Sequence, residues 1–160
     1  MLKRALIASM TMLLLAAATK AYTSQNVYDL ARQEQAAIEA AGFTFPPFAL
    51  YSHRYSMTSG LTMTSEQPVR HVVLLQYSYW QGEDEARGVA AHELGHVLLN
   101  ESVWRLTLDE QERFANWIGA CFGTDGARQW LKANRRADPT ADQCETLYRW
   151  LTTPPFSEFF

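Results

Sequence analysis

Two histidines and a glutamate near the middle of the chain have a spacing that suits metal chemistry. They lie in the stretch "AAHELGHVLLN", residues 90–100. On an α-helix His92 and His96 share one face, one turn apart, so their imidazoles could chelate one metal ion. Glu93 lies one step round the helix, where a carboxylate misses the metal and reaches a metal-activated water. Zinc lowers the pKa of its water toward ~7. The pattern therefore predicts a zinc-activated water that attacks a carbonyl, with Glu93 as general base.

The surroundings of this motif predict a buried helix. Apolar residues lie on nearly all sides of it: Val89, Ala90, Ala91, Leu94, Val97, Leu98 and Leu99. A helix that is apolar all round belongs in a protein core. Two histidines and a glutamate at such a place need partners, because buried polar groups without them are costly. This favours a metal site over two histidines that share a helix by coincidence.

Two histidines are too few for a zinc site, so a third ligand must come from elsewhere. The candidates are His53, His71, Glu101, Asp109, Glu110 and Glu112. The segment 109–122 has helical periodicity, with a core stripe of Phe114, Trp117, Ile118, Cys121 and Phe122. Glu112 falls on a separate face of this helix. We therefore expect Glu112 to be the third ligand, 16 residues after His96.

Small residues on both helices support this choice. Ala115, Asn116 and Gly119 cluster around Glu112, while Gly88 and Gly95 lie beside the face of the two histidines. We expect these faces to meet closely. Asn116, one turn after Glu112, could then hold a ligand histidine from behind, and Asp109, one turn before it, is the other candidate for that role.

The coarse pattern of the chain is a helix, a small sheet and four further helices. Residues 24–43 have helical periodicity and end near Gly42. Residues 43–80 are rich in aromatic, Thr and Val residues and predict two or three short strands, best defined at 70–77. Helices are then expected at 83–100, 107–123, 124–136 and 139–151, the second with a capping box of Thr107 and Glu110. The fold class is α+β, mostly helical, with a small sheet before the metal-binding helix.

The two motif segments together resemble a known class of enzymes. "HELGHVLL" followed by "ERFANWIGACF" is similar to the gluzincin pattern, His-Glu-x-x-His and then Glu-x-x-Ala-Asn/Asp, in the style of ImmA/IrrE-type zinc peptidases. The resemblance covers about residues 90–121. It implies a zincin-like metallopeptidase domain with Zn²⁺ held by His92, His96 and Glu112, and with Glu93 as general base. Thermolysin-like and HtpX-like relatives have Asp where this chain has Asn116.

A peptidase of this kind also needs a group that stabilises the tetrahedral oxyanion. His71, Tyr77, Tyr79, Tyr148 and Arg149 are candidates, and each of them could equally be a packing or surface residue. The strand predicted at 70–77 resembles the strand that zincins use to align a peptide by main-chain hydrogen bonds. Its apolar run is also what a plain core strand requires.

The N-terminus predicts export. A basic start, an apolar run over residues 5–18 and small residues up to Ala21 read as a signal peptide, 1–21, cleaved after Ala18 or Ala21. An uncleaved anchor is the alternative, but 14 residues are fewer than the ~20 that span a bilayer. The domain then comprises residues 22–160, in a periplasmic or secreted protein. In an oxidising compartment Cys121 and Cys144 are expected to form a disulfide rather than two buried thiols.

The net charge of the chain indicates which classes of binding partner to expect. The chain has 14 basic and 17 acidic residues, and removal of Lys3, Arg4 and Lys20 with the signal peptide leaves a net charge of −6. A net acidic chain argues against nucleic acid and anionic membrane surfaces. The expected partner is a peptide or protein substrate.

Two alternatives to an enzyme stay open. In the first, zinc is structural and stabilises a non-catalytic module that binds a peptide or protein. The presence of Glu93 argues against a structural zinc site, because a closed structural site does not need a general base. In the second, the chain is a purely structural helical domain and the motif residues coincide by chance. The apolar C-terminal tail, "TTPPFSEFF", could pack on the domain, dock a partner or be disordered.

Overall fold

The computed structural model describes residues 23–54, 58–66, 69–77, 80, 82–100, 105–134 and 136–152. The predicted signal peptide, Tyr79, Glu101 and the tail from residue 153 onward lie outside the described residues. Within the described part, no helix is both long enough and apolar enough to cross a membrane.

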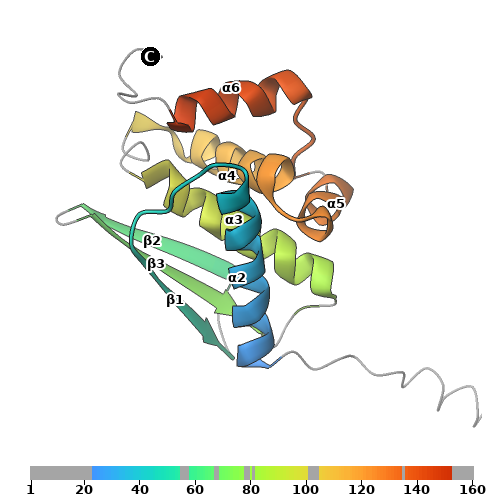
Figure 1. Ribbon diagram of the computed structural model, residues 1–160. Coiled ribbons are helices and arrows are strands. Elements are labelled where there is room, and N and C mark those ends of the chain that lie inside the picture. Colours follow the sequence, from blue (N-terminus) through green and yellow to red (C-terminus); the bar gives the residue numbers. More distant parts are fainter. Residues whose placement is uncertain are drawn as a thin grey trace, which may run out of the picture.

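The described elements follow the predicted order and make an α+β fold (Figure 1). Helix α2 (Ser24–Ala40) precedes the strands β1 (Phe48–His53), β2 (Gly60–Glu66) and β3 (Val69–Gln76). The helices α3 (Glu83–Leu99), α4 (Leu108–Phe122), α5 (Asp125–Ala133) and α6 (Ala141–Thr152) follow. Local signals set several of the ends. Gly42 has a φ of 104° just beyond α2, and the predicted capping box of Thr107 and Glu110 starts α4. The predicted fold class is confirmed at this level.

The three strands form a mixed sheet in the order β1-β3-β2. β3 pairs in parallel with β1 and antiparallel with β2, so that Val73 lies opposite both Leu50 and Thr62. Of the two alternatives for the strand at 70–77, the structure supports the plain core strand, because both edges of β3 are already hydrogen-bonded to neighbouring strands. Its apolar run reflects a central position in the sheet. The two edge strands are β1 and β2.

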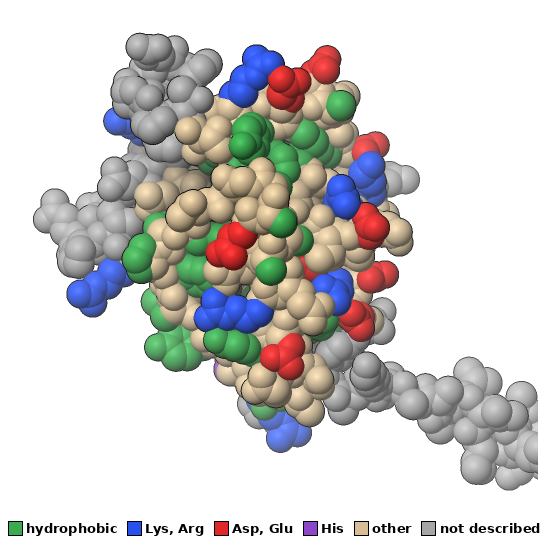
Figure 2. Space-filling view, viewed as in Figure 1, with side chains coloured by type: hydrophobic (Ala, Val, Ile, Leu, Met, Phe, Trp, Pro, Cys, Tyr) green, Lys and Arg blue, Asp and Glu red, His purple; other side chains and the backbone are tan. Residues whose placement is uncertain are grey.

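The two faces of the sheet differ in character. The inner face carries the buried side chains of His71, Val73 and Leu75 against the helices. On the outer face large apolar side chains are exposed, among them Tyr51, Leu61 and Met63. In the view of Figure 2, hydrophobic side chains reach the surface at the left, where the sheet lies, while acidic and basic side chains are interspersed elsewhere. Neither sign of charge gathers into a patch on that face of the molecule.

Helix α3 is the centre of the domain. The sheet lies on one side of it and α4 and α5 on the other, while α2 packs across α3 and β1 (Figure 1). Its buried residues include all the apolar side chains around the histidine motif: Val89, Ala90, Ala91, Leu94, Val97, Leu98 and Leu99. The prediction of a core helix is confirmed, and every neighbouring element contributes to its burial.

α3 and α4 approach each other through small residues. A Cβ atom added at Gly95 would lie 2.7 Å from the carbonyl oxygen of Ala115, and one at Gly119 would lie 3.1 Å from the Cβ of Ala91. The predicted contact between the two faces is thus confirmed at these positions. The expectation for Gly88 was wrong: it faces Trp130 of α5, whose indole leaves room only for a glycine there.

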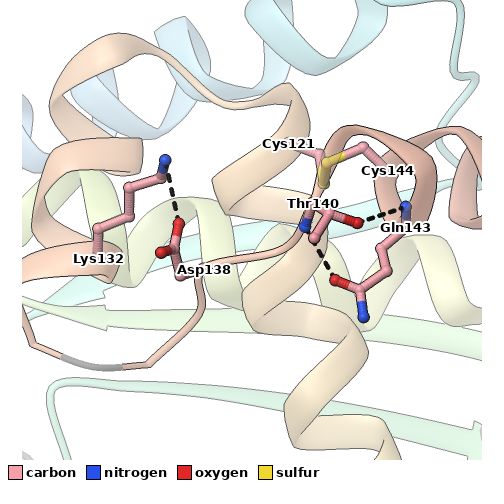
Figure 3. Close-up of a disulfide and its surroundings, with 6 residues drawn as sticks. All are labelled: Cys121, Lys132, Asp138, Thr140, Gln143 and Cys144. Atoms are coloured by element: carbon pink, nitrogen blue, oxygen red, sulfur yellow. Dashed lines mark hydrogen bonds and ion pairs between the residues drawn. A yellow bond between two sulfur atoms is a disulfide. The ribbon is translucent and has the colours of Figure 1, made fainter.

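The far side of α4 packs against α6. The predicted core stripe is confirmed, since Phe114, Trp117, Ile118 and Phe122 join an apolar cluster with Leu147 and Trp150. Cys121 and Cys144 form the predicted disulfide between the two helices, with their Cα atoms 5.6 Å apart (Figure 3). This cross-link fixes α6 to the helix that carries Glu112.

A buried carboxylate ties α2 to the rest of the domain. Glu34 is fully buried; it accepts hydrogen bonds from Arg87 at 3.0 Å and from the backbone N–H of Thr124 at 2.9 Å. The hydroxyl of Thr124 donates a further hydrogen bond to it at 2.6 Å. A buried charge is tolerated only with such partners. One side chain therefore links α2, α3 and the start of α5.

The α3–α4 contact predicts an unusual response to Gly95→Ala. Alanine is ordinarily favoured over glycine inside a helix, but here the added methyl meets the backbone of Ala115 at 2.7 Å. We expect Gly95→Ala to lower the free energy of unfolding by about 1–3 kcal/mol, as overpacking does. Gly82→Ala is the control, because nothing lies within 4 Å of its added Cβ. Equal thermal unfolding of parent and Gly95→Ala protein would contradict the close contact.

Candidate metal centre

Three predicted ligands converge in the structure. One ligand atom each from His92, His96 and Glu112 lies within 4.8 Å of the others, which is a group that could hold a metal ion. The two Nε2 atoms are 3.2 Å apart, and the Glu112 carboxylate oxygens lie 3.3 Å from His92 Nε2 and 3.4 Å from His96 Nε2. A tetrahedral centre with bonds of about 2.0–2.1 Å separates its ligand atoms by roughly 3.3 Å. The donor atoms thus fit such a centre in both type and spacing.

The group is buried on one side and open on the other. The side chains of His92 and His96 are 17% and 14% exposed, while that of Glu112 is 48% exposed. All three line a cavity of about 470 Å³. Structural zinc sites are closed by four protein ligands, whereas catalytic sites use three and keep a position open. The described group offers three protein donors and faces an open cavity.

Asn116 fixes the orientation of His92. Its Nδ2 donates a hydrogen bond of 2.8 Å to the backbone carbonyl of Glu112, so its Oδ1 is the atom that faces His92 Nδ1, at 3.1 Å. Nδ1 must then carry the proton, and the Nε2 lone pair is left for a metal. Asn116 thus lies beside one of the two histidines that we expect to be ligands, and its orienting role stays a prediction.

Glu112 is kept in its charged form by the same neighbours. When His92 and His96 also carry protons at Nε2, hydrogen bonds from His92 and then His96 hold the pKa of the Glu112 carboxyl far below its ordinary value, and they outweigh the opposing effect of partial burial. The carboxylate is therefore ionised at any pH at which the histidines can bind a metal. Protons and a metal compete for the two Nε2 atoms, so metal binding weakens as the solution is acidified.

Glu93 lies in the same cavity but outside the ligand group. It is only 5% exposed, and one carboxylate oxygen accepts a hydrogen bond of 2.6 Å from the hydroxyl of Thr62 on β2. Its other oxygen faces Gly60, where an added Cβ would lie 2.6 Å away. The edge strand therefore holds Glu93 beside the histidines, and Gly60 leaves the room that the carboxylate occupies.

Several other predicted residues lie away from the metal group. Asp109 is exposed in the first turn of α4, and the structure does not bring it to either histidine. Glu110 caps its own helix by accepting a hydrogen bond from the backbone of Thr107 at 2.8 Å. His71 is buried on β3, with its ring nitrogens 2.9 Å from the Thr64 hydroxyl and 3.0 Å from Asn100 Oδ1. His53 ends β1 and does not line the cavity.

The described candidates for the oxyanion role do not line the cavity either. Tyr148 packs edge-on against Phe43 in the aromatic cluster on α6. Arg149, on the same helix, forms an ion pair with Glu145. Tyr77 packs against the core beside the sheet, and Tyr79 lies outside the described residues. The polar groups that do reach the cavity are Thr58, Thr62, Thr64 and Gln111.

Sequence reasoning missed the contribution of β2. Thr62 and Thr64 alternate with the exposed Leu61 and Met63, so a period of two placed both threonines on one face. That pattern could be recognised in the sequence, but the sequence did not indicate which strand lies beside α3. The rim residue Leu108, 70% exposed at the start of α4, was likewise not anticipated.

Comparisons with known proteins add no identification. No protein-family model, no curated protein and no solved structure matches the chain.

The geometry predicts distinct effects on metal affinity. Glu112→Ala removes a donor atom and is expected to lose most zinc binding. Asn116→Ala should weaken zinc binding by about 10- to 100-fold, as loss of a ligand's orienting partner does. Asn116→Asp keeps an acceptor beside Nδ1 and should retain most of the affinity. Titration against a competing chromophoric chelator measures all three.

Asp109→Ala serves as the control in that series. It removes a carboxylate from the same helix, on a side chain that the structure leaves exposed. We expect wild-type affinity for this variant. Loss of zinc in Asp109→Ala together with full retention in Asn116→Ala would reverse the assignment of the orienting residue.

Proposed function

We propose that this protein is a zinc-dependent metallopeptidase of the gluzincin type, with a zincin-like domain. One observation carries the proposal. Two imidazole nitrogens and a carboxylate oxygen meet at ligand spacing on one wall of an open cavity, and a separate buried carboxylate, Glu93, lines the same cavity. A site that only stabilised the fold would need neither the open side nor the extra carboxylate.

Each side chain has a defined role in this proposal. His92, His96 and Glu112 hold the zinc ion, and Asn116 keeps His92 in the tautomer that binds it. When bound, zinc supplies Lewis-acid activation of water and of the scissile carbonyl. Glu93 accepts a proton from the attacking water as the new C–O bond forms. It then delivers that proton to the departing amine nitrogen as the C–N bond breaks.

The edge strand supports a polypeptide substrate. In the described part of the chain β2 pairs with β3 alone, and its residues Gly60, Thr62 and Thr64 line the cavity. An extended peptide can add to such an edge through main-chain hydrogen bonds. In this pose the bound segment would run along the cavity that is lined by Glu93 and the proposed zinc ligands. The cavity is thus suited to a segment of extended chain.

The disulfide supports an exported enzyme. Disulfides such as that between Cys121 and Cys144 form and persist in oxidising compartments. This agrees with the signal peptide that we infer at residues 1–21. We therefore propose that the enzyme acts in the periplasm or outside the cell.

Glu93→Gln tests the proposed function. The amide preserves the size of the side chain and its contact with Thr62 but cannot take up a proton. We expect one zinc ion per chain, as in the wild type, with hydrolysis of unfolded casein reduced about 10²- to 10⁴-fold. Zinc content is measured by plasma mass spectrometry, and cleavage by fluorescence release.

The matched control is Glu145→Gln, the same change on an exposed part of α6 where the partner is Arg149. It should retain wild-type activity. Undiminished hydrolysis by Glu93→Gln would remove Glu93 as the base. A zinc-loaded wild-type protein that hydrolyses no peptide would instead favour the non-catalytic binding module.

A further inference from the structure

The groove at the metal site continues past the metal ligands into a second cavity. The first cavity extends toward Leu108 and Gln111. The second, of about 520 Å³, extends toward Trp130, Asn134 and Arg136. Both are lined by Thr58, Gly60, His92 and Glu93, so they adjoin at the metal site. A bound chain would therefore have contacts on both sides of the bond over Glu93.

Among the described residues that line the second cavity, Arg136 is the one with a cationic side chain, and its backbone is firmly held. Its N–H donates a hydrogen bond of 2.9 Å to the carbonyl of the buried Leu131 at the end of α5. The next residue, Ala137, is also buried, and its N–H reaches the same carbonyl at 3.4 Å. An ion pair of 3.2 Å between Lys132 and Asp138 spans this segment (Figure 3). The backbone that carries the Arg136 guanidinium is therefore held in place.

The wall beside Arg136 is also set by close packing. Gly88 allows the indole of Trp130 to lie against α3, since an added Cβ would meet the ring at 2.2 Å. Asn134 donates a hydrogen bond of 2.9 Å to the backbone carbonyl of Trp130, which secures the last turn of α5. Trp130, Asn134 and Arg136 therefore form one defined wall of the cavity.

Among the described residues, no carboxylate pairs with the charge of Arg136. It forms no ion pair with any acid among the described residues, including Glu85 on the same cavity. By contrast Arg87, Arg128 and Arg149 each bind a carboxylate. A guanidinium presents a planar fork of N–H donors that matches a carboxylate. Arg136 is thus an available carboxylate receptor beside the metal group.

The direction of β2 indicates which part of a substrate reaches Arg136. Gly60, where the strand begins, lines both cavities, whereas Thr64, further along, lines only the first. A peptide that pairs antiparallel with β2 runs from Thr64 toward Gly60. Antiparallel pairing is also the more stable arrangement. The residues that follow the cleaved bond then enter the second cavity.

We propose that Arg136 selects substrates that carry a carboxylate on the C-terminal side of the cleaved bond. The carboxylate is either the free C-terminus of a peptide or an Asp or Glu side chain, and both present the same group to the guanidinium. This inference rests on the proposed peptidase function and adds its substrate preference.

The test starts from cleavage sites mapped in unfolded casein by mass spectrometry. One cleaved sequence is then made as three fluorogenic peptides: with a free C-terminal carboxylate, with a C-terminal amide, and with the amide plus a Glu after the cleaved bond. Wild type should cleave a carboxylate-bearing peptide roughly tenfold better than the plain amide, chiefly through a lower KM. Preference for the free terminus or for the Glu peptide identifies the source of the carboxylate.

Variants then assign the preference to Arg136. Arg136→Gln should abolish it while hydrolysis of the plain amide continues, and Arg136→Lys should keep part of it. Arg128→Gln removes the same charge from α5 at a residue that binds Asp125 and does not line the cavity, so it should behave as wild type. Binding of the labelled peptides to the zinc-loaded Glu93→Gln protein, followed by fluorescence anisotropy, should show the same order.

The outcomes separate the two proposals. If wild type cleaves no casein, the peptidase function fails. If it cleaves all three peptides equally well, or if Arg136→Gln keeps the preference, the peptidase function stands and the role of Arg136 is refuted.

Discussion

The close contact between α3 and α4 is the constraint on which the rest of the structure depends. Gly95 and Ala115 let the two backbones approach until no further carbon atom fits at Gly95. His92 and His96 project from α3 and Glu112 from α4, so the helix separation sets the distance between their donor atoms. The disulfide and the aromatic cluster beyond α4 hold this geometry from the other side.

The contact also explains how polar groups persist in the most buried helix. α3 is apolar in almost every direction, yet it carries two histidines and a glutamate. Burial of such groups is costly unless each has a partner. Asn116 from α4 supplies one for His92, Thr62 from the sheet edge supplies one for Glu93, and Glu112 lies against both histidines. All the partners come from elements that pack directly on α3.

Much of this could be predicted from the sequence because the signals are local. Periodicity and caps located the helices, and the small residues around Glu112 and Asn116 identified the face that meets α3. Strand order could not be read in the same way, since pairing depends on contacts between distant segments. The apolar run at 70–77 therefore pointed to β3, whereas the edge strand at the site is β2. His71 was a candidate by residue type, but its ring nitrogens face Thr64 and Asn100 inside the fold. The second cavity depends on how the end of α5 packs, and no sequence motif predicts that packing.

The central claim is that His92, His96 and Glu112 together bind zinc. X-ray absorption at the zinc K-edge of the zinc-loaded protein tests it most directly. The account predicts one zinc ion per chain, with two imidazole nitrogens among its ligands at about 2.0–2.1 Å, the others oxygen, and no sulfur. A spectrum with a sulfur ligand, with fewer than two imidazoles, or with zinc surrounded by water alone would contradict it.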